Sequence, residues 1–235
     1  MPEEINRLLT DQIADLLFTP SQDGGENLIR EGIAKEKIHF VGNVMIDTLL
    51  RMLSATKPLW SEFSQRLAIS EKECGLVTLH RPSNVDHSEN LLSIIRTLDE
   101  ISQSLPLIFP IHPRTHARLK AEGGMQGFNA RLILTQPVGY LDFLCLQQHA
   151  GLVITDSGGI QGETTILGVP CLTVRENTER PITVAMGTNI LIGRDMERLK
   201  LEVDRILSNK AKKSGIPPLW DGKAGERIAA IVANI

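Results

Sequence analysis

The sequence predicts an α/β protein: a Rossmann-like parallel sheet with helices on both faces. Short apolar runs alternate along the chain with longer segments whose apolar residues recur at helical spacing. Strands that alternate with helices form parallel sheets, because each helix carries the chain back across one face. The chain is long enough for a sizeable core, since 42% of its 235 residues are hydrophobic and 23% are charged.

The first segment begins with an amphipathic helix pattern. Pro2-Glu3-Glu4 precedes apolar residues at helical spacing that continue to Leu17, and proline and acidic residues are typical of a first helical turn. With so few strands nearby for this helix to pack on, we expect the chain to start in the middle of a domain. The other elements expected here are strands at 16–19 and 37–41, a short helix at 27–32 and a helix from Ile46.

A polar stretch lies near 54–61, and a second, complete unit is expected to follow a domain junction in the region 42–60. Strands are expected at 76–79, 107–111, 131–134, 152–155, 171–174 and 189–192. Helices are expected at 91–101, 140–149, 159–167, 196–207 and 225–235.

Charge and cysteine content narrow the function classes. The net charge is -3, from 25 basic and 28 acidic residues without a basic block, which argues against nucleic acid or a membrane surface as the main partner. Cys74, Cys145 and Cys171 are widely separated, so we expect no disulfide or metal site, and the last two are expected to be buried thiols. No apolar stretch reaches membrane-spanning length and the N-terminus lacks a signal-peptide core, so the expected location is the cytoplasm.

The most informative motif follows the expected strand at 152–155. Asp156 is followed by Ser157-Gly158-Gly159 and then by a helical pattern. Two glycines let the backbone approach a ligand closely, and a helix N-terminus offers unpaired N–H groups to an anion. The motif therefore predicts a site for a phosphate-bearing molecule, although an ordinary strand-to-helix turn explains the spacing equally well.

Polar residues at the ends of five expected strands strengthen this prediction. In open parallel sheets, ligands bind beyond the carboxyl ends of the strands. A lone histidine is usually structural, but two at equivalent strand ends beside an anion turn favour a functional role, and arginines suit phosphate recognition. The five strands are followed by His80-Arg81, His112-Pro113-Arg114, Thr135-Gln136, Asp156-Ser157-Gly158-Gly159 and Arg175-Glu176-Asn177.

Two more residues have both a functional and a structural interpretation. Glu163, in the first turns of the helix after the glycine turn, could accept the two adjacent hydroxyls of a ribose, or it could be an acid placed to suit the helix dipole. Phe143 could line a base pocket or belong to the core. The remaining histidines have no supporting context and are expected to be structural.

With these residues assembled, the chain resembles the non-hydrolysing UDP-N-acetylglucosamine 2-epimerases, in family order from residue 1 to about 195. The resemblance implies a glycosyltransferase-B-like fold of two Rossmann-like domains with the active site in the cleft between them. Residues 1–43 would then be a remnant of the first domain, and 44–235 the UDP-binding second domain. The matching stretches are 1–7, 17–21, 41–43, Val77-Thr78-Leu79-His80-Arg81-Pro82, Asp156-Ser157-Gly158-Gly159-Ile160-Gln161 and Glu176-Asn177-Thr178-Glu179-Arg180-Pro181.

The resemblance also implies roles for single residues. Glu3 and His80 correspond to active-site acid–base residues, and His112 corresponds to a histidine near a regulatory substrate site. The other residues implied to contact the UDP-sugar, together with the strand-end Arg81, are Arg7, Val138, Phe143, Ser157, Gly158, Gly159, Glu163 and Arg180.

The implied reaction interconverts UDP-GlcNAc and UDP-ManNAc. UDP leaves first, which makes the C2 proton more acidic and gives a glucal intermediate; UDP re-adds after protonation on the opposite face. Such chemistry needs acid–base groups on both faces of the sugar and strong stabilisation of the leaving diphosphate. No metal or redox cofactor is required.

Other functions stay open at this point. The chain could be a UDP-binding half-protein with little turnover of its own, completed by a separately encoded N-terminal half; a homodimer, common in the family, is the other expected assembly. A glycosyltransferase of the same fold class is disfavoured by the combination of His80-Arg81-Pro82 with the motif at 156–161. A misassigned start codon would also explain the short first domain.

Overall fold

The computed structural model describes residues 2–121 and 127–234, with side chains from Glu4 onward. The chain forms two compact units. The first comprises Met1–Arg51 and Ile216–Ile235, and the second comprises Met52–Gly215. Within the described residues, no helix is both long and apolar enough to cross a membrane.

The second unit is built on a six-stranded sheet in the order β5-β4-β3-β6-β7-β8, and every pairing in it is parallel. From β3 the chain moves outward through β4 and β5, returns to β6 beside β3, and moves outward again through β7 and β8. The order therefore reverses between β3 and β6, which is the switch point where such sheets bind ligands. The strands are β3 (Gly75–Thr78), β4 (Leu107–Pro110), β5 (Leu132–Thr135), β6 (Leu152–Thr155), β7 (Cys171–Thr173) and β8 (Asn189–Leu191).

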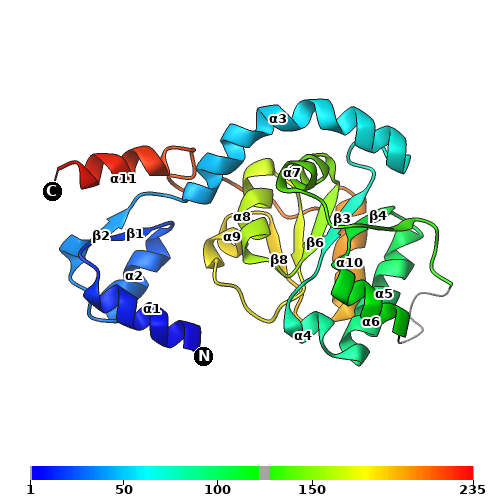
Figure 1. The fold of residues 1–235 in the computed structure, drawn as a ribbon, viewed down its shortest axis with the longest axis horizontal. Coiled ribbons are helices and arrows are strands. Elements are labelled where there is room, and N and C mark those ends of the chain that lie inside the picture. Colours follow the sequence, from blue (N-terminus) through cyan, green and yellow to red (C-terminus); the bar gives the residue numbers. More distant parts are fainter. Residues whose placement is uncertain (1, 122–126, 235) are drawn as a thin grey trace. The chain divides into compact units, whose positions relative to one another are not determined.

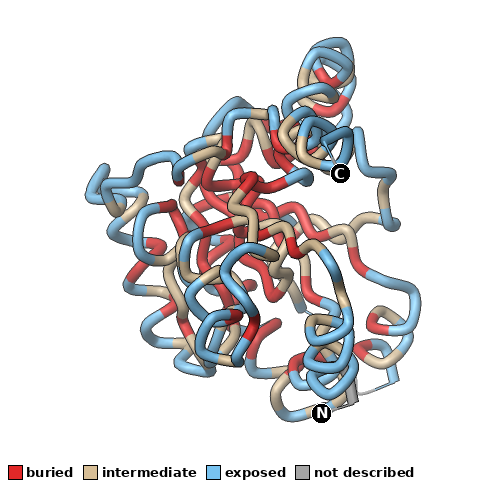
Figure 2. The backbone as a smooth tube through the Cα atoms, turned by 90° about the vertical axis from the view of Figure 1, so that its left-hand side faces the viewer, coloured by how far each residue is buried: buried red, intermediate tan, exposed pale blue. Residues whose placement is uncertain are grey.

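Helices cover both faces of this sheet (Figure 1). Successive residues of a strand point to opposite faces, so Leu107 and Phe109 of β4 belong to one apolar cluster and Ile108 to the other. The first cluster includes residues of α5 and α10, and the second includes residues of α7 and the end of α3. Buried residues concentrate in these strands (Figure 2). The helices are α3 (Val44–Leu67), α4 (Pro82–Val85), α5 (Ser88–Ser102), α6 (Pro113–Ala121), α7 (Tyr140–His149), α8 (Gly158–Leu167), α9 (Pro181–Ala185) and α10 (Met196–Leu207).

The first unit has a much smaller sheet. β1 (Leu17–Thr19) pairs in parallel with β2 (Ile38–Phe40). One cluster of buried residues in this unit contains Leu17, Leu28 and Ile33. The helices of this part are α1 (Pro2–Ile13), α2 (Gln22–Arg30) and the short 3-10 helix η1 (Lys35–Lys37).

The C-terminal segment completes the first unit. The Asp47 carboxylate accepts hydrogen bonds from the N–H groups of Ala224 and Gly225, at 3.2 and 2.7 Å, and so caps helix α11 (Ala224–Val232). The buried Trp220 donates its indole N–H to the Pro20 carbonyl oxygen at 2.8 Å. Residues far apart in sequence therefore form one unit.

Most elements expected from the sequence are confirmed. All eight expected strands are present with ends within one residue, and the helices at 140–149 and 196–207 have the expected bounds. All three cysteines are buried and free, as expected for Cys145 and Cys171. Helices α4, α6 and α9 were not anticipated, although each begins at a proline, the residue favoured at the first helical position.

The boundary between the compact units, at Arg51 and Met52, falls within the expected junction at 42–60, but the helix expected from Ile46 does not end at the polar stretch, because α3 continues through it to Leu67. Trp60, Phe63 and Leu67 recur at helical spacing and pack on one cluster of the second unit, so the polar residues between them form the outer face. The compact units also differ from the expected division after residue 43, since they place 216–235 with the first segment.

Candidate functional site

A buried aspartate organises the switch point of the second unit. Asp156 follows β6 and has no exposed surface. Its carboxylate accepts hydrogen bonds from the backbone N–H groups of His80 (3.1 Å to each oxygen) and Arg81 (2.9 Å), which follow β3, and from the Asn84 side chain (3.0 Å). One carboxylate therefore fixes the two strand ends against each other.

The same carboxylate orients the imidazole of His80. Nδ1 of His80 lies 3.0 Å from Oδ1 of Asp156. This hydrogen bond raises the pKa of His80 above its ordinary value. Burial alone would raise the pKa of Asp156, but the hydrogen bonds from His80, Arg81 and Asn84 outweigh burial and lower it. With Nδ1 held by Asp156, Nε2 is the ring nitrogen available to exchange a proton with a ligand.

The glycine turn forms the N-terminus of α8, as expected. Ser157 is the N-cap in an extended conformation, and its side chain makes no capping hydrogen bond. Its N–H donates to Oγ1 of Thr155 at 3.0 Å. The first N–H groups of an α-helix have no intrahelical acceptor, and the helix dipole favours an anion in front of them. Gly158 and Gly159 leave that approach free of a Cβ.

A cluster of two arginines and one glutamate lies beside this turn. Glu179 accepts two hydrogen bonds from Arg175, at 2.6 and 2.8 Å, and one from Arg81 at 3.5 Å. A Cβ built on Gly158 would be 3.2 Å from Oε2 of Glu179. The loop after β7 therefore places a carboxylate against the glycine turn.

Buried Gln161 of α8 ties this loop to the helix. The Thr178 hydroxyl donates to Oε1 of Gln161 at 2.5 Å and accepts the backbone N–H of Arg180 at 2.9 Å. Thr183 also donates to Oε1 of Gln161, at 3.5 Å. The backbone on either side of Glu179 is thus fixed relative to the glycine turn.

Glu163 lies in the same helix and is 4% exposed. Its Oε1 accepts the Tyr140 hydroxyl at 3.1 Å, while its Oε2 is buried without a hydrogen-bond partner among the described residues. Burial raises the pKa of Glu163. The first turn of α8 contains no acidic residue, so Glu163 is not a helix-start acid. Phe143 is half-buried and packs against the apolar cluster that contains Ile108. Val138 is half-buried in the loop before α7.

His112 and His80 line a common cavity of about 240 Å³. Asp86 in this cavity pairs with Arg114 at 3.3 Å and with Arg118 at 3.4 Å. The structure therefore brings the expected strand-end residues after β3 and β4 together.

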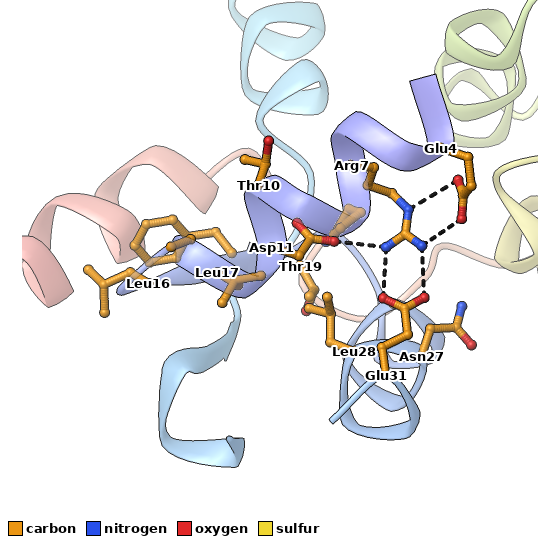
Figure 3. Close-up of a pocket in the computed structure, with 14 residues that line it drawn as sticks. Glu4, Arg7, Thr10, Asp11, Leu16, Leu17, Thr19, Asn27, Leu28 and Glu31 are labelled. Atoms are coloured by element: carbon orange, nitrogen blue, oxygen red, sulfur yellow. Dashed lines mark hydrogen bonds and ion pairs between the residues drawn. The ribbon is translucent and has the colours of Figure 1, made fainter. Parts of the chain in front are cut away.

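Arg7 belongs to the first unit and has a different environment. Figure 3 shows its guanidinium between the carboxylates of Glu4, Asp11 and Glu31, at 2.7–2.8 Å. It lines an open cavity of about 680 Å³ with residues of α1, β1 and α2. Glu3 belongs to α1, but its side chain lies outside the described part of the structure.

The structure adds residues to those expected from the sequence. Asp156 and Gln161 appear in the motif only as neighbours of the glycines, and Glu179 only as part of a matching stretch. Most of the residues that contact them lie in loops or short helices that follow other strands. A signal was available for Asp156, since a carboxylate directly after an apolar strand is either a ligand or a bridge to its neighbours.

Comparisons with known proteins identify the family of the chain. A family model described as UDP-N-acetylglucosamine 2-epimerase matches residues 1–233. A UDP-N-acetylglucosamine 2-epimerase of Methanococcus maripaludis is 43% identical over 238 residues, which cover 99% of this chain and 64% of the relative. A UDP-2,3-diacetamido-2,3-dideoxy-D-glucuronate 2-epimerase of Pseudomonas aeruginosa is 37% identical, with 100% and 64% covered.

A solved structure shows the same fold. The UDP-GlcNAc 2-epimerase of Methanocaldococcus jannaschii, in complex with UDP-GlcNAc and UDP, superposes with a TM-score of 0.87 at 42% identity, and the match covers 100% of this chain and 65% of that one. The chain thus spans 64% of the length of the two curated relatives above. Since the family match extends over nearly the whole sequence, this protein belongs to the UDP-N-acetylglucosamine 2-epimerase family.

Proposed function

We propose that the second unit binds the uridine diphosphate part of a UDP-N-acetylhexosamine, and that this site serves the interconversion of UDP-GlcNAc and UDP-ManNAc. The observation that carries the proposal is the switch point of the sheet. There the glycine turn of α8 and the His80–Asp156 pair lie on adjacent strand ends. Relatives named for 2-epimerisation of UDP-sugars support it.

The diphosphate binds in front of the glycine turn. The first N–H groups of α8 and the helix dipole stabilise its charge, and no side chain at Gly158 or Gly159 obstructs it. Arg81 and Arg180 contribute cationic contacts, since guanidinium groups match the geometry of phosphate oxygens.

The nucleoside binds along α7 and α8. The unpartnered Oε2 of Glu163 accepts a ribose hydroxyl, which satisfies a buried acceptor that is otherwise costly. Phe143 and the backbone near Val138 contact the uracil. This placement gives Glu163 a function that its burial by itself does not explain.

The chemistry requires proton transfer at C2 and departure of UDP from C1. Breaking the C1–O bond and removing the C2 proton give a glucal and UDP; adding a proton to the opposite face of C2 and UDP to C1 gives the epimer. His80, whose Nε2 is free of Asp156, and Glu3 are proposed acid–base groups. His112 is the proposed contact for a regulatory substrate molecule. The proposed assembly is a homodimer or a complex with a separately encoded N-terminal half.

A second candidate is UDP binding without independent catalysis. The chain spans 64% of the length of the two curated relatives above, and it contains the six-stranded sheet that carries the proposed nucleotide-binding residues. In this case the purified chain binds UDP and turns over little or nothing.

One experiment distinguishes these functions. The purified chain is incubated with UDP-GlcNAc in D2O, and the C1 and C2 protons of the sugar are followed by NMR. Formation of UDP-ManNAc with deuterium at C2 supports epimerisation by the chain. Broadening of the UDP resonances without exchange supports the second candidate. Unchanged resonances contradict both.

A matched pair of variants tests the nucleoside contact. Glu163→Gln is expected to weaken binding of both UDP and uridine by about tenfold, since each ligand carries the ribose. Glu202→Gln removes another nearly buried carboxylate of the same unit, on α10, and is expected to leave both affinities unchanged. Equal changes in UDP and uridine affinity for the two variants, measured by titration calorimetry, would refute the role of Glu163.

A further inference from the structure

The cluster beside the glycine turn contains an internal anion. Arg175 directs both of its terminal nitrogens at the two oxygens of Glu179. Planar guanidinium groups bind carboxylates and phosphates through the same fork of donors. The Glu179 carboxylate also lies against Gly158, where a Cβ would be 3.2 Å from its Oε2. The Glu179 carboxylate thus contacts a guanidinium group and lies against the glycine turn, the two kinds of group that would bind a phosphate.

Arg175 is already paired with a carboxylate when no ligand is bound, which poses a problem for diphosphate binding. Arg175 lowers the pKa of Glu179 to about 2, so this carboxylate is ionised at neutral pH. A diphosphate placed before Gly158 would meet a like charge at close range, and like charges repel each other. Either the carboxylate moves or the ligand binds weakly.

The surroundings allow the side chain to move while its backbone stays in place. The Glu179 side chain is 59% exposed, whereas that of Arg175 is 12% exposed. Thr178 and the N–H of Arg180, on either side of Glu179, are held by the Gln161 network. Rotation of one exposed side chain is therefore sufficient to uncover a guanidinium that remains in the site.

We propose that Arg175 is a further diphosphate-binding residue and that Glu179 is the internal anion that the ligand displaces from it. This inference rests on the proposed function, because it presumes a diphosphate at the glycine turn. It also assigns a specificity: a ligand with two phosphates competes with the Glu179 carboxylate better than one with a single phosphate or none.

The test is titration calorimetry with UDP, UMP and uridine. Glu179→Gln is expected to tighten UDP binding about two- to fivefold and to leave uridine unchanged, since a partly exposed ion pair is lost. Arg175→Gln is expected to weaken UDP binding about tenfold, and Arg175→Lys, which keeps the charge but not the fork, to weaken it less. Glu176→Gln removes the same charge from the same loop and is expected to have no effect, since Glu176 is paired at 4.0 Å with Arg194.

The double variant makes the test specific. If Glu179 acts mainly by occupying Arg175, the gain from Glu179→Gln is smaller in the Arg175→Gln background, where only the repulsion at Gly158 is relieved. Weaker or unchanged UDP binding by Glu179→Gln would overturn the inference, as would an equal gain in both backgrounds. Absence of UDP binding by the unaltered chain would overturn the proposed function as well, so the two failures are distinguishable. Circular dichroism of each variant confirms that the fold is retained.

Discussion

The two units both alternate strands with helices, yet they differ in the size of their sheets and in how completely their apolar residues are buried. In the second unit, six parallel strands separate two apolar clusters, and Leu107, Ile108 and Phe109 are all at most 1% exposed. In the first unit, two strands support a small cluster, and α1 leaves Ile5, Leu9 and Ile13 60–82% exposed. Parallel sheets are stable when both faces are covered, and a two-stranded sheet is marginal. Similar local patterns therefore give units of different stability.

The largest expected difference comes from core truncations. Phe109→Ala in the second unit is expected to cost about 4 kcal/mol, and Leu28→Ala in the first about 2 kcal/mol, because the smaller cluster is already partly open. Hydrogen exchange read by mass spectrometry reports the two units separately. Ile13→Ala, at an 82% exposed position, is the control without expected loss. A greater cost for Leu28→Ala would reverse the comparison.

The second unit also depends on a buried polar anchor. Asp156→Ala is expected to cost about 3 kcal/mol, because it leaves the buried amide of Asn84 and the N–H groups of His80 and Arg81 without their acceptor. Asp195→Ala removes an exposed N-cap that accepts the Arg198 N–H at 2.9 Å, and about 1 kcal/mol is expected. Urea unfolding measures both. Equal costs would show that Asp156 is not an anchor.

A smaller effect is expected from the tie between the two segments of the first unit. Trp220→Phe removes the hydrogen bond to the Pro20 carbonyl oxygen and is expected to cost about 1 kcal/mol. Faster exchange should appear in β1 and β2, while β3 and β6 keep their protection. Loss of protection in all four strands would mean that the units unfold together.

The smallest expected effect is the pH dependence from His80. Because its pKa is raised in the folded state, His80 contributes stability that is fully present below its unfolded pKa of 6.5 and is lost as the pH rises through the folded value. The half-exposed imidazole keeps this contribution small. Asp156→Asn should return the pKa of His80 toward 6.5 in an NMR titration, and Asp86→Asn should not. No difference between the variants would contradict the assigned pair.

The sequence predicts the second unit well because its signals are local. Apolar runs identify the strands of this unit that the structure describes, and helical spacing identifies most of the longer helices between them. The parallel pairing then brings the ends of β3 and β6 together. The glycine turn and His80 follow from those strand ends. The partners of Asp156 and Gln161, and the contact of Glu179 with Arg81, do not, since these hydrogen bonds join loops that only the folded sheet brings together.

The first unit shows the other limit of local signals. Nothing in residues 216–235 indicates that Trp220 donates to Pro20, or that Asp47 caps α11. The polar residues at 54–61 conceal the continuation of α3, although Trp60, Phe63 and Leu67 carry the helical period. A helix that is buried on one side only is predicted correctly when its helical period is followed through the polar residues of its exposed face.

The joining of distant segments in the first unit sets an order of events during synthesis. All strands of the second unit leave the ribosome before residue 216, so its sheet can form while translation continues. Residues 1–51 emerge before the second unit but lack the Trp220 hydrogen bond and the capped helix α11 until residues 216–235 are made. The segment 1–51 is therefore synthesised before the second unit but is completed only after it.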